Sequence, residues 1–304
     1  MDTENVQEEM AVTNIDIMQW ASLAVVTAFM SPALASAEFV VTTDGLSVEQ
    51  QNAVRVAADH WTACFEMPDE IRLRVTAVDR GPTGFAYTNM VRNLDGLPLR
   101  DVWYPTALAQ QILGYRLLNE DDINVFINKD TNWYLPSKLP IRADQIDLIN
   151  VMLHEIAHGL GISSATFLSW QPPNEASIGL PNDYVNFFDY SFTLHEQDGT
   201  PHVYDSFIRT ADGQPLTAFE NPSLMLADEL NREGVSFSGE QSRSVNGGVP
   251  VLVAPGNVSH VKPVEQDRRL MQPSSGAGET IHNIDPIVLA MMQDIGWVIN
   301  DKCL

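Results

Sequence analysis

The sequence predicts an α+β fold with two lobes: a twisted mixed sheet with long helices first, then an irregular lobe that ends in a final helix. Three observations predict it. Strand-like and helix-like segments alternate between residues 39 and 128. A strongly amphipathic helical run follows from Asp144. Residues 163–255 are then rich in Pro, Asn, Asp and Gly, which is typical of irregular structure.

The elements of the first lobe follow from their apolar spacing. Phe39–Val41 is predicted to be a strand, and Val48–Phe65 has apolar residues at helical spacing. Ile71–Val78 alternates apolar with polar residues, which predicts a half-buried strand. Trp103–Leu118 is predicted to be helical. Ile123–Asn128 alternates again, and we interpret it as the edge strand of the sheet.

The run DQIDLINVMLHEIAHGL, which starts at Asp144, predicts a helix with one apolar face that must pack on a sheet. Gly159 and Gly161 are expected to end it. The insertion at 163–255 is predicted to hold a few strands, among them Val249–Val253. Near the C-terminus, Asp285-Pro286 is expected to open the last helix and Gly296 to stop it.

The first 37 residues are predicted to be an export signal. Met18–Ala37 is apolar with small residues at its end, and Ala35-Ser36-Ala37 fits the pattern of signal peptidase cleavage after Ala37. The residues before this run are acidic, and translation from Met10 or Met18 remains an alternative. A membrane anchor is the other alternative, although the run is short for a bilayer span. We expect a secreted protein.

The remaining chain, residues 38–304, is predicted to be one catalytic domain and is strongly acidic. The whole sequence has 40 acidic and 17 basic residues; the first 37 contain five acidic and no basic residues, so the mature net charge is −18. Such a field repels phosphate backbones and anionic lipid headgroups, which disfavours nucleic acids and membrane surfaces as partners. With 44% hydrophobic residues, the chain has enough apolar material for a sizeable core.

The sequence has two cysteines, Cys64 and Cys303. An oxidising compartment would permit them to pair, and this bond would tie the C-terminus to the first helix. The alternative is that Cys64 masks a metal ion as a propeptide thiol does.

The motif His154-Glu155-Ile156-Ala157-His158 places two imidazoles four residues apart, on one helical face, where both can reach a single ion. Catalytic zinc binds such ligands and keeps one position open. Glu155 flanks the metal, and we expect it to take a proton from zinc-bound water that attacks a carbonyl and to pass it to the leaving amine. The alternative has both histidines as solvated residues of an amphipathic helix.

A catalytic zinc needs a third protein ligand. His154–Gly161 (HEIAHGLG) resembles the metzincin signature, in which a glycine lets the chain turn sharply after the second ligand. The usual third histidine would fall at position 164, where this sequence has Ser164. His260 is followed eleven residues later by Met271, in SHVKPVEQDRRLMQP, and then by the final helix.

This arrangement resembles leishmanolysin-like metzincins, zinc peptidases in which an insertion separates the glycine from the third histidine and an LM-x-P turn follows. The resemblance implies that His260 is the third Zn²⁺ ligand and that Met271 is the Met-turn residue beneath the ion. It also implies that an extended protein or peptide substrate pairs with the edge strand, which we place at Ile123–Asn128. If His260 is only a loop residue, the substitute ligands in the insertion are Asp189, His195 or His202.

The sequence therefore predicts a secreted zinc endopeptidase with His154, His158 and His260 as metal ligands and Glu155 as general base. A secreted binding or adhesion protein with a purely structural zinc site remains an alternative, although such a site would not require the glutamate and is usually closed by four ligands. Hydrolysis of a non-peptide amide by the same residues is the other alternative.

Overall fold

The computed structural model describes residues 38–66, 69–135, 139–169, 172–179, 198–264, 268–274 and 276–303. The predicted export signal at 1–37 lies outside the described residues, as do Asp189 and His195. Within the described part of the chain, no helix combines the length and the apolar character that a bilayer span needs.

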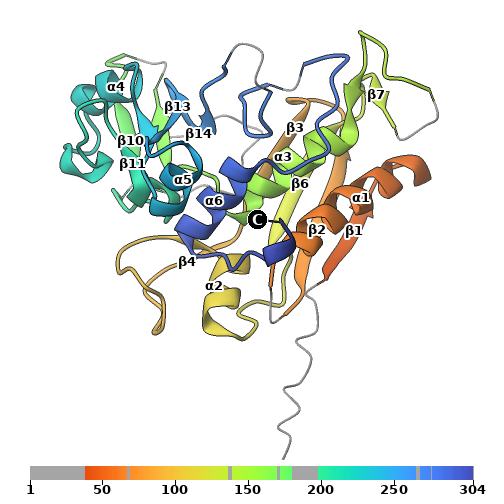
Figure 1. The fold of residues 1–304 in the computed structure, drawn as a ribbon, viewed down its shortest axis with the longest axis horizontal. Helices are drawn as coiled ribbons and strands as arrows, with labels where there is room; N and C mark the ends of the chain where they lie inside the picture. Colours follow the sequence, from red (N-terminus) through yellow and green to blue (C-terminus); the bar gives the residue numbers. More distant parts are fainter. Residues whose placement is uncertain are drawn as a thin grey trace, which may run out of the picture. The chain divides into compact units, whose positions relative to one another are not determined.

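A four-stranded mixed sheet underlies the first half of the described chain (Figure 1). Its order is β1 (Phe39–Asp44), β2 (Ile71–Val78), β6 (Ile123–Asn128), β3 (Gly84–Thr88). β1, β2 and β6 are parallel, whereas β3 is antiparallel to β6. β6 is therefore an inner strand, and the prediction that Ile123–Asn128 forms the edge is wrong.

Among the described strands, β3 is the outermost strand of this sheet next to the helix that carries His154 and His158, and the sequence did not indicate this position. The buried residues Ile123, Val125 and Ile127 of β6 alternate with half-buried ones, and this alternation is the same for an inner strand and an edge strand. β3 has only five residues, GFAYT, and four of them are half-buried. Its pairing with β6 is a long-range contact that periodicity does not report.

Two helices, α1 (Val48–Cys64) and α3 (Leu148–Leu160), lie side by side over one face of the sheet (Figure 1). The buried Trp61 of α1 donates from Nε1 to the Leu153 carbonyl of α3 at 3.2 Å. Gly159 lets α3 close on β6, because a Cβ there would lie 2.3 Å from Cγ2 of Ile123.

Two predicted helices are shorter in the structure. α3 begins at Leu148 and not at Asp144, because the buried carboxylate of Asp147 accepts the first free backbone N–H groups and caps the helix. α2 spans Thr106–Leu113 and stops at Gly114, whose φ is +76°. Before α2, β5 (Tyr104–Pro105) pairs with β4 (Met90–Val91), so the predicted helical start at residue 103 is wrong.

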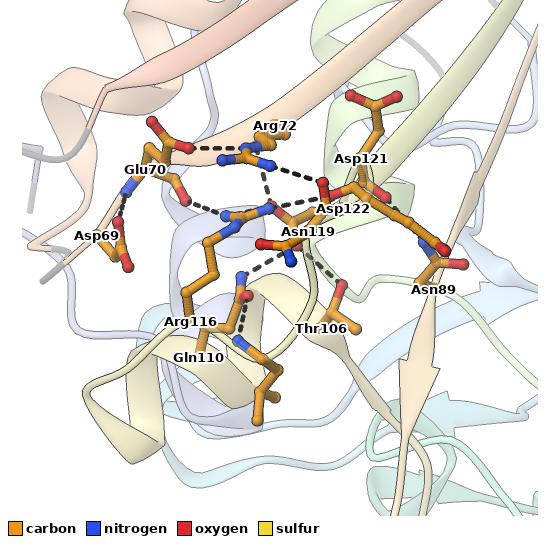
Figure 2. Close-up of polar contacts among 12 residues, drawn as sticks. Asp69, Glu70, Arg72, Asn89, Thr106, Gln110, Arg116, Asn119, Asp121 and Asp122 are labelled. Carbon is orange, nitrogen blue, oxygen red and sulfur yellow. Dashed lines mark hydrogen bonds and ion pairs between the residues drawn. The ribbon is translucent and has the colours of Figure 1, made fainter.

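Figure 2 shows the polar cluster that ties α2 to the sheet, centred on the fully buried Asp122. Its Oδ1 accepts from Thr106 Oγ1 at 3.1 Å and from Gln110 Nε2 at 3.0 Å. Its Oδ2 accepts from the backbone N–H of Arg72 at 2.9 Å and from both terminal nitrogens of Arg116 at 3.2 Å. The Arg116 side chain is 15% exposed, so this is a buried ion pair with its remaining acceptor positions filled.

The second half of the chain is built from short elements. An antiparallel sheet has the order β11 (Ile208–Arg209), β12 (Ser236–Phe237), β13 (Val251–Ala254), β14 (Asn257–Val261). The other elements around it are the hairpin β9 (Thr166–Leu168) and β10 (Ala176–Ile178), the 3₁₀ turns η3 (Tyr204–Phe207) and η4 (Leu216–Ala218), and the helices α4 (Leu224–Leu230) and α5 (Glu240–Val245). The predicted insertion is therefore more regular than its composition suggests.

The C-terminal elements agree with the sequence. α6 (Pro286–Ile295) has Asp285 as N-cap and Gly296 as C-cap, both as predicted. The chain then reaches η5 (Asp301–Cys303), where Cys303 forms a disulfide with Cys64 of α1. The predicted pairing is thus present, and it leaves no thiol at Cys64 to mask a metal. A short parallel pair, β7 (Trp133–Tyr134) and β8 (Ile146–Asp147), precedes α3. The predicted α+β class is confirmed.

Candidate metal centre

Helix α3 supplies the first two side chains of the centre. His154 and His158 lie one helical turn apart, and their Nε2 atoms are 3.0 Å apart. His154 is buried and His158 half-buried, so the pair lies within the protein and not on a solvated helix face. The alternative of two solvated histidines is therefore wrong.

The third side chain, His260, comes from β14, 102 residues after His158. Its Nε2 lies 3.2 Å from the Nε2 of His154 and 3.2 Å from that of His158. The structure thus brings together all three histidines that the sequence predicts as ligands, in a group that can hold a metal ion.

The ring nitrogens that face away from the group fix the tautomers. Each Nδ1 lies within hydrogen-bond distance of an oxygen that only accepts: Leu270 O at 2.7 Å for His154, Ile162 O at 2.6 Å for His158, and Asn257 Oδ1 at 2.7 Å for His260. Each Nδ1 therefore carries the proton, and each Nε2 presents a lone pair.

Three lone pairs that face one another at 3.0–3.2 Å repel, and a cation among them removes the repulsion. An ion about 2.0–2.1 Å from each imidazole nitrogen, the usual Zn–N distance, fits among atoms so spaced. The N–H···O bonds behind the rings orient ligands in the manner typical of metal-binding histidines. The donor set therefore fits a metal ion.

The electrostatics of the group keep the imidazoles neutral, which is the form that binds metals. Burial lowers the pKa of His154. Burial also holds the pKa of His158 well below its usual range, and the neighbouring His154 and His260 reinforce the effect. Burial and His154 lower the pKa of His260 to about 3.

Glu155 lies between the ligand pair and the edge strand. Its side chain is buried, and burial raises its pKa to about 8, an effect that a hydrogen bond from the backbone N–H of Ala86 partly offsets. β3 passes so closely that a Cβ at Gly84 would lie 2.7 Å from Oε1 of Glu155 and 2.7 Å from Cγ1 of Val151. Glycine at position 84 therefore lets the edge strand reach the candidate base, a role that the sequence alone did not reveal.

A cavity of about 200 Å³ opens beside Glu155 and His154. The start of β3, helix α3 and the segment after Met271 line it, with Gly84, Val151 and Pro273 among the lining residues. A ligand in this cavity would touch both the candidate base and one metal ligand.

The turn at Met271 joins the two elements that carry the ligands. The carbonyl of Leu270 accepts from His154, and the carbonyl of the buried Met271 accepts from the backbone N–H of Val261 at 2.7 Å, next to His260. The backbone N–H of Leu270 in turn donates to Oδ2 of Asp285, the cap of α6. The turn is thus bonded to α3, β14 and α6 at once.

His202, an alternative ligand, is not part of the group. Its Nδ1 donates to the Ser163 carbonyl at 2.9 Å, and its Nε2 is buried without a hydrogen-bond partner among the described residues. His202 is therefore bonded to the segment that follows α3 and not to the metal-binding group.

Two supporting residues had no signal in the sequence: Asn257, which bonds His260, and Ala86, which bonds Glu155. Leu270 belongs to the turn that the sequence indicated, but its bond to His154 appears only in the fold.

The comparisons with known proteins add one match. A family model described as SPBPB7E8-like matches residues 83–178, which is less than half of the chain. This stretch contains β3, β6 and α3, and hence Glu155 with the first two histidines, whereas His260 lies beyond it. None of the curated proteins matches the chain, and none of the solved structures does.

Proposed function

We propose that this chain is a secreted zinc-dependent endopeptidase whose catalytic domain, residues 38–304, has the two-lobed organisation of leishmanolysin-like metzincins. The observation that carries the proposal is that the Nε2 lone pairs of three histidines converge beside the buried Glu155, which is not a member of this metal-binding group. A structural zinc site normally has four protein ligands, whereas three leave a position for water or substrate.

The residues have distinct roles in this proposal. His154, His158 and His260 hold the ion, and zinc bound there would polarise a substrate carbonyl and make water more acidic. A cation held by the three histidines would lower the raised pKa of Glu155 and favour its ionised form. The carboxylate then accepts the proton of the attacking water and delivers it to the leaving amine. The backbone N–H of Ala86 orients the Glu155 carboxylate through its hydrogen bond. The buried Met271 belongs to the turn that supports His154 and β14, and it would help to hold the ligands of a bound ion in place.

The substrate is proposed to bind as an extended peptide along β3. This strand is the outermost of the described strands of the sheet and contacts α3, and its residue Ala86 bonds Glu155. Addition of a peptide strand to a sheet edge is a common mode of recognition. We therefore place the substrate-binding strand at Gly84–Thr88 and not at the predicted Ile123–Asn128.

Secretion with removal of residues 1–37 is supported by the small residues before Glu38 and by the disulfide between Cys64 and Cys303, because such bonds persist in oxidising compartments. The acidic net charge supports protein or peptide substrates over nucleic acids.

A digest of a peptide library by the purified protein, with and without a chelator, tests the proposal. The wild type should cleave, the chelator should stop cleavage, and added zinc should restore it. Glu155→Gln should retain stoichiometric zinc and lose about 10²–10⁴-fold in rate, the usual contribution of a general acid–base group. Glu240→Gln, an exposed glutamate at the start of α5, is the matched control and should cleave normally.

Two outcomes would favour other functions. Stoichiometric zinc without cleavage of any peptide, together with cleavage of small non-peptide amides, would indicate an amidohydrolase. Zinc without any hydrolysis would indicate a binding or adhesion protein with a structural site.

A further inference from the structure

Ser164 lies at the position where the third histidine of the contiguous motif would fall. In the structure it forms hydrogen bonds with two residues that are distant in sequence. Its backbone N–H donates to Oγ of Ser259 at 2.9 Å. Its hydroxyl donates to Oδ1 of Asp205 at 2.5 Å. Ser164 therefore links the exit of α3 to the residue directly before His260.

Asp205 is the centre of this link. The side chain is buried, and its Oδ2 accepts from the backbone N–H groups of Ala165 at 2.8 Å and His202 at 2.9 Å. With Ser164 Oγ, these donors are all neutral groups. A carboxylate buried among neutral donors is favourable only while every donor stays in place, so Asp205 fixes the relative position of the segments that supply them.

Tyr204, the residue before Asp205, is hydrogen-bonded directly to β14. Tyr204 is fully buried and donates its hydroxyl to the Val258 carbonyl at 2.8 Å. Tyr204 and Asp205 are consecutive in η3, so this short turn holds β14 with one residue and the exit of α3 with the next. Asn257 orients the His260 ring, but it belongs to the same strand and moves with it.

We infer that Asp205 is a positioning residue for the third metal ligand: through Ser164 and Ser259 it fixes β14 relative to α3, so that His260 meets the helical pair. The inference rests on the proposed metal site. It does not depend on peptide cleavage.

Asp205 can affect metal affinity because metal coordination tolerates only small displacements of its ligands. Ligands must be held within about 0.5 Å of the productive geometry, and groups behind the ligands typically contribute 10–100-fold to metal affinity. His154 and His158 receive their spacing from the helix itself, whereas His260 lies on a separate hairpin. A displacement of that hairpin changes the two 3.2 Å contacts of His260 and leaves the 3.0 Å contact within α3 unchanged.

Ser259→Ala in the full-length protein is the first test, since it removes the acceptor of the Ser164 N–H and little volume. The dissociation constant for zinc, measured by competition with a chelator, should rise about tenfold or more. The visible absorption of the cobalt-substituted protein should change, because it reports the ligand geometry. Ser259→Thr retains a hydroxyl group, and threonine is well tolerated in strands such as β14. Its zinc dissociation constant and cobalt absorption should therefore match those of the wild type.

Ser236→Ala in β12, a buried serine of the same sheet, is the matched control and should leave zinc affinity and the cobalt spectrum unchanged. Asp205→Asn should weaken zinc binding at least as much as Ser259→Ala. Combined with Ser259→Ala it should add less than the sum of the two single effects, because both act through Ser164.

Zinc affinities within twofold of wild type for Ser259→Ala and for Asp205→Asn, with an unchanged cobalt spectrum, would overturn the inference. If Asp205→Asn does not fold, Ser259→Ala decides alone. A wild type that binds no zinc overturns the proposed function and this inference together. A wild type that binds zinc without cleaving peptides overturns only the endopeptidase proposal, because no measurement here uses cleavage.

Discussion

The two regions that supply the metal ligands hold them in different ways. In the first region, α3 sets the spacing of His154 and His158 through its own backbone, and apolar packing on the β1–β2–β6–β3 sheet holds the helix in place. In the second region, His260 lies on β14, in a sheet of short strands, and polar bonds between distant segments hold that strand. The first two ligands depend on local structure and the third on tertiary contacts.

One buried carboxylate in each region illustrates the difference. Asp122 is paired with Arg116, so the charge of one side chain compensates that of the other. The donors that the described part of the chain offers to Asp205 are all neutral, and this residue connects the exit of α3 to β14 through Ser164. Changes in the first region should therefore appear mainly in the free energy of unfolding, and changes in the second mainly in metal affinity.

Asp122→Ala should have the largest effect on stability. It leaves the mostly buried Arg116 without its counter-charge and removes the acceptor of Thr106 and Gln110. The loss of one partner of a buried pair typically costs about 3–5 kcal/mol, which urea unfolding measures. The folded fraction should keep its zinc affinity. Asp121→Ala removes a partly exposed pair with Arg74 and should cost far less. An equal cost for the two variants would contradict the difference drawn here between buried and exposed pairs.

His260→Ala should have the largest effect on metal affinity. Removal of a direct ligand should weaken zinc binding by more than the roughly 100-fold upper range for supporting residues. The melting temperature of the metal-free protein should change little, since His260 is half-buried and, among the described residues, its ring bonds only Asn257 outside the histidine group. Calorimetric titration with zinc measures the first effect, and His60→Ala in α1 is the control. If His260→Ala still binds zinc tightly and stoichiometrically, the third ligand is a residue other than His260.

The sequence was sufficient for features that depend on near neighbours. The two histidines and Glu155 follow from a spacing of four residues on one helix. The caps Asp285 and Gly296 of α6 follow from residue types at the helix ends. His260 and Met271 were found through the resemblance to a family and not through any property of the residues themselves.

The remaining features depend on contacts between distant segments. The edge position of β3 follows from its pairing with β6 across about 40 residues, and the alternation within Ile123–Asn128 is compatible with either position in the sheet. Ser164 looks only like a missing histidine until Asp205, 41 residues away, is placed beside it. No local pattern distinguishes Asp205 from the other acidic residues of the insertion.

Gly159→Ala tests whether close packing of α3 on the sheet contributes to the first region. The added Cβ would overlap Cγ2 of Ile123, and overpacking typically costs about 1–3 kcal/mol. Alanine by itself is favoured over glycine in a helix by about 1 kcal/mol, so the sign of the change is informative. In an Ile123→Ala background the overlap is gone, and Gly159→Ala should then be neutral or stabilising in urea unfolding. A destabilisation of the same size in both backgrounds would contradict the packing argument.

The smallest effect is expected from Asp285→Asn, which tests how the last helix supports the turn at Met271. Burial raises the pKa of Asp285, although its carboxylate accepts bonds from the backbone N–H groups of Val288 and Leu270. As pH rises through the ordinary aspartate range near 3.8, the unfolded chain releases this proton first while the folded protein retains it. The folded state then binds more protons than the unfolded state, so the contribution of Asp285 to stability falls with rising pH.

Asparagine cannot release a proton and removes this dependence. The wild type should therefore have its greatest stability advantage over Asp285→Asn at the acidic end, and the difference should shrink as pH rises above about 4. Unfolding of both metal-free proteins by urea at several pH values measures the difference, in which the titration of Glu155 and the three histidines cancels because it is common to both. A difference that grows with pH would mean that the two backbone donors hold the carboxylate charged, and Asp285 would then support the Leu270 carbonyl behind His154 as an anion.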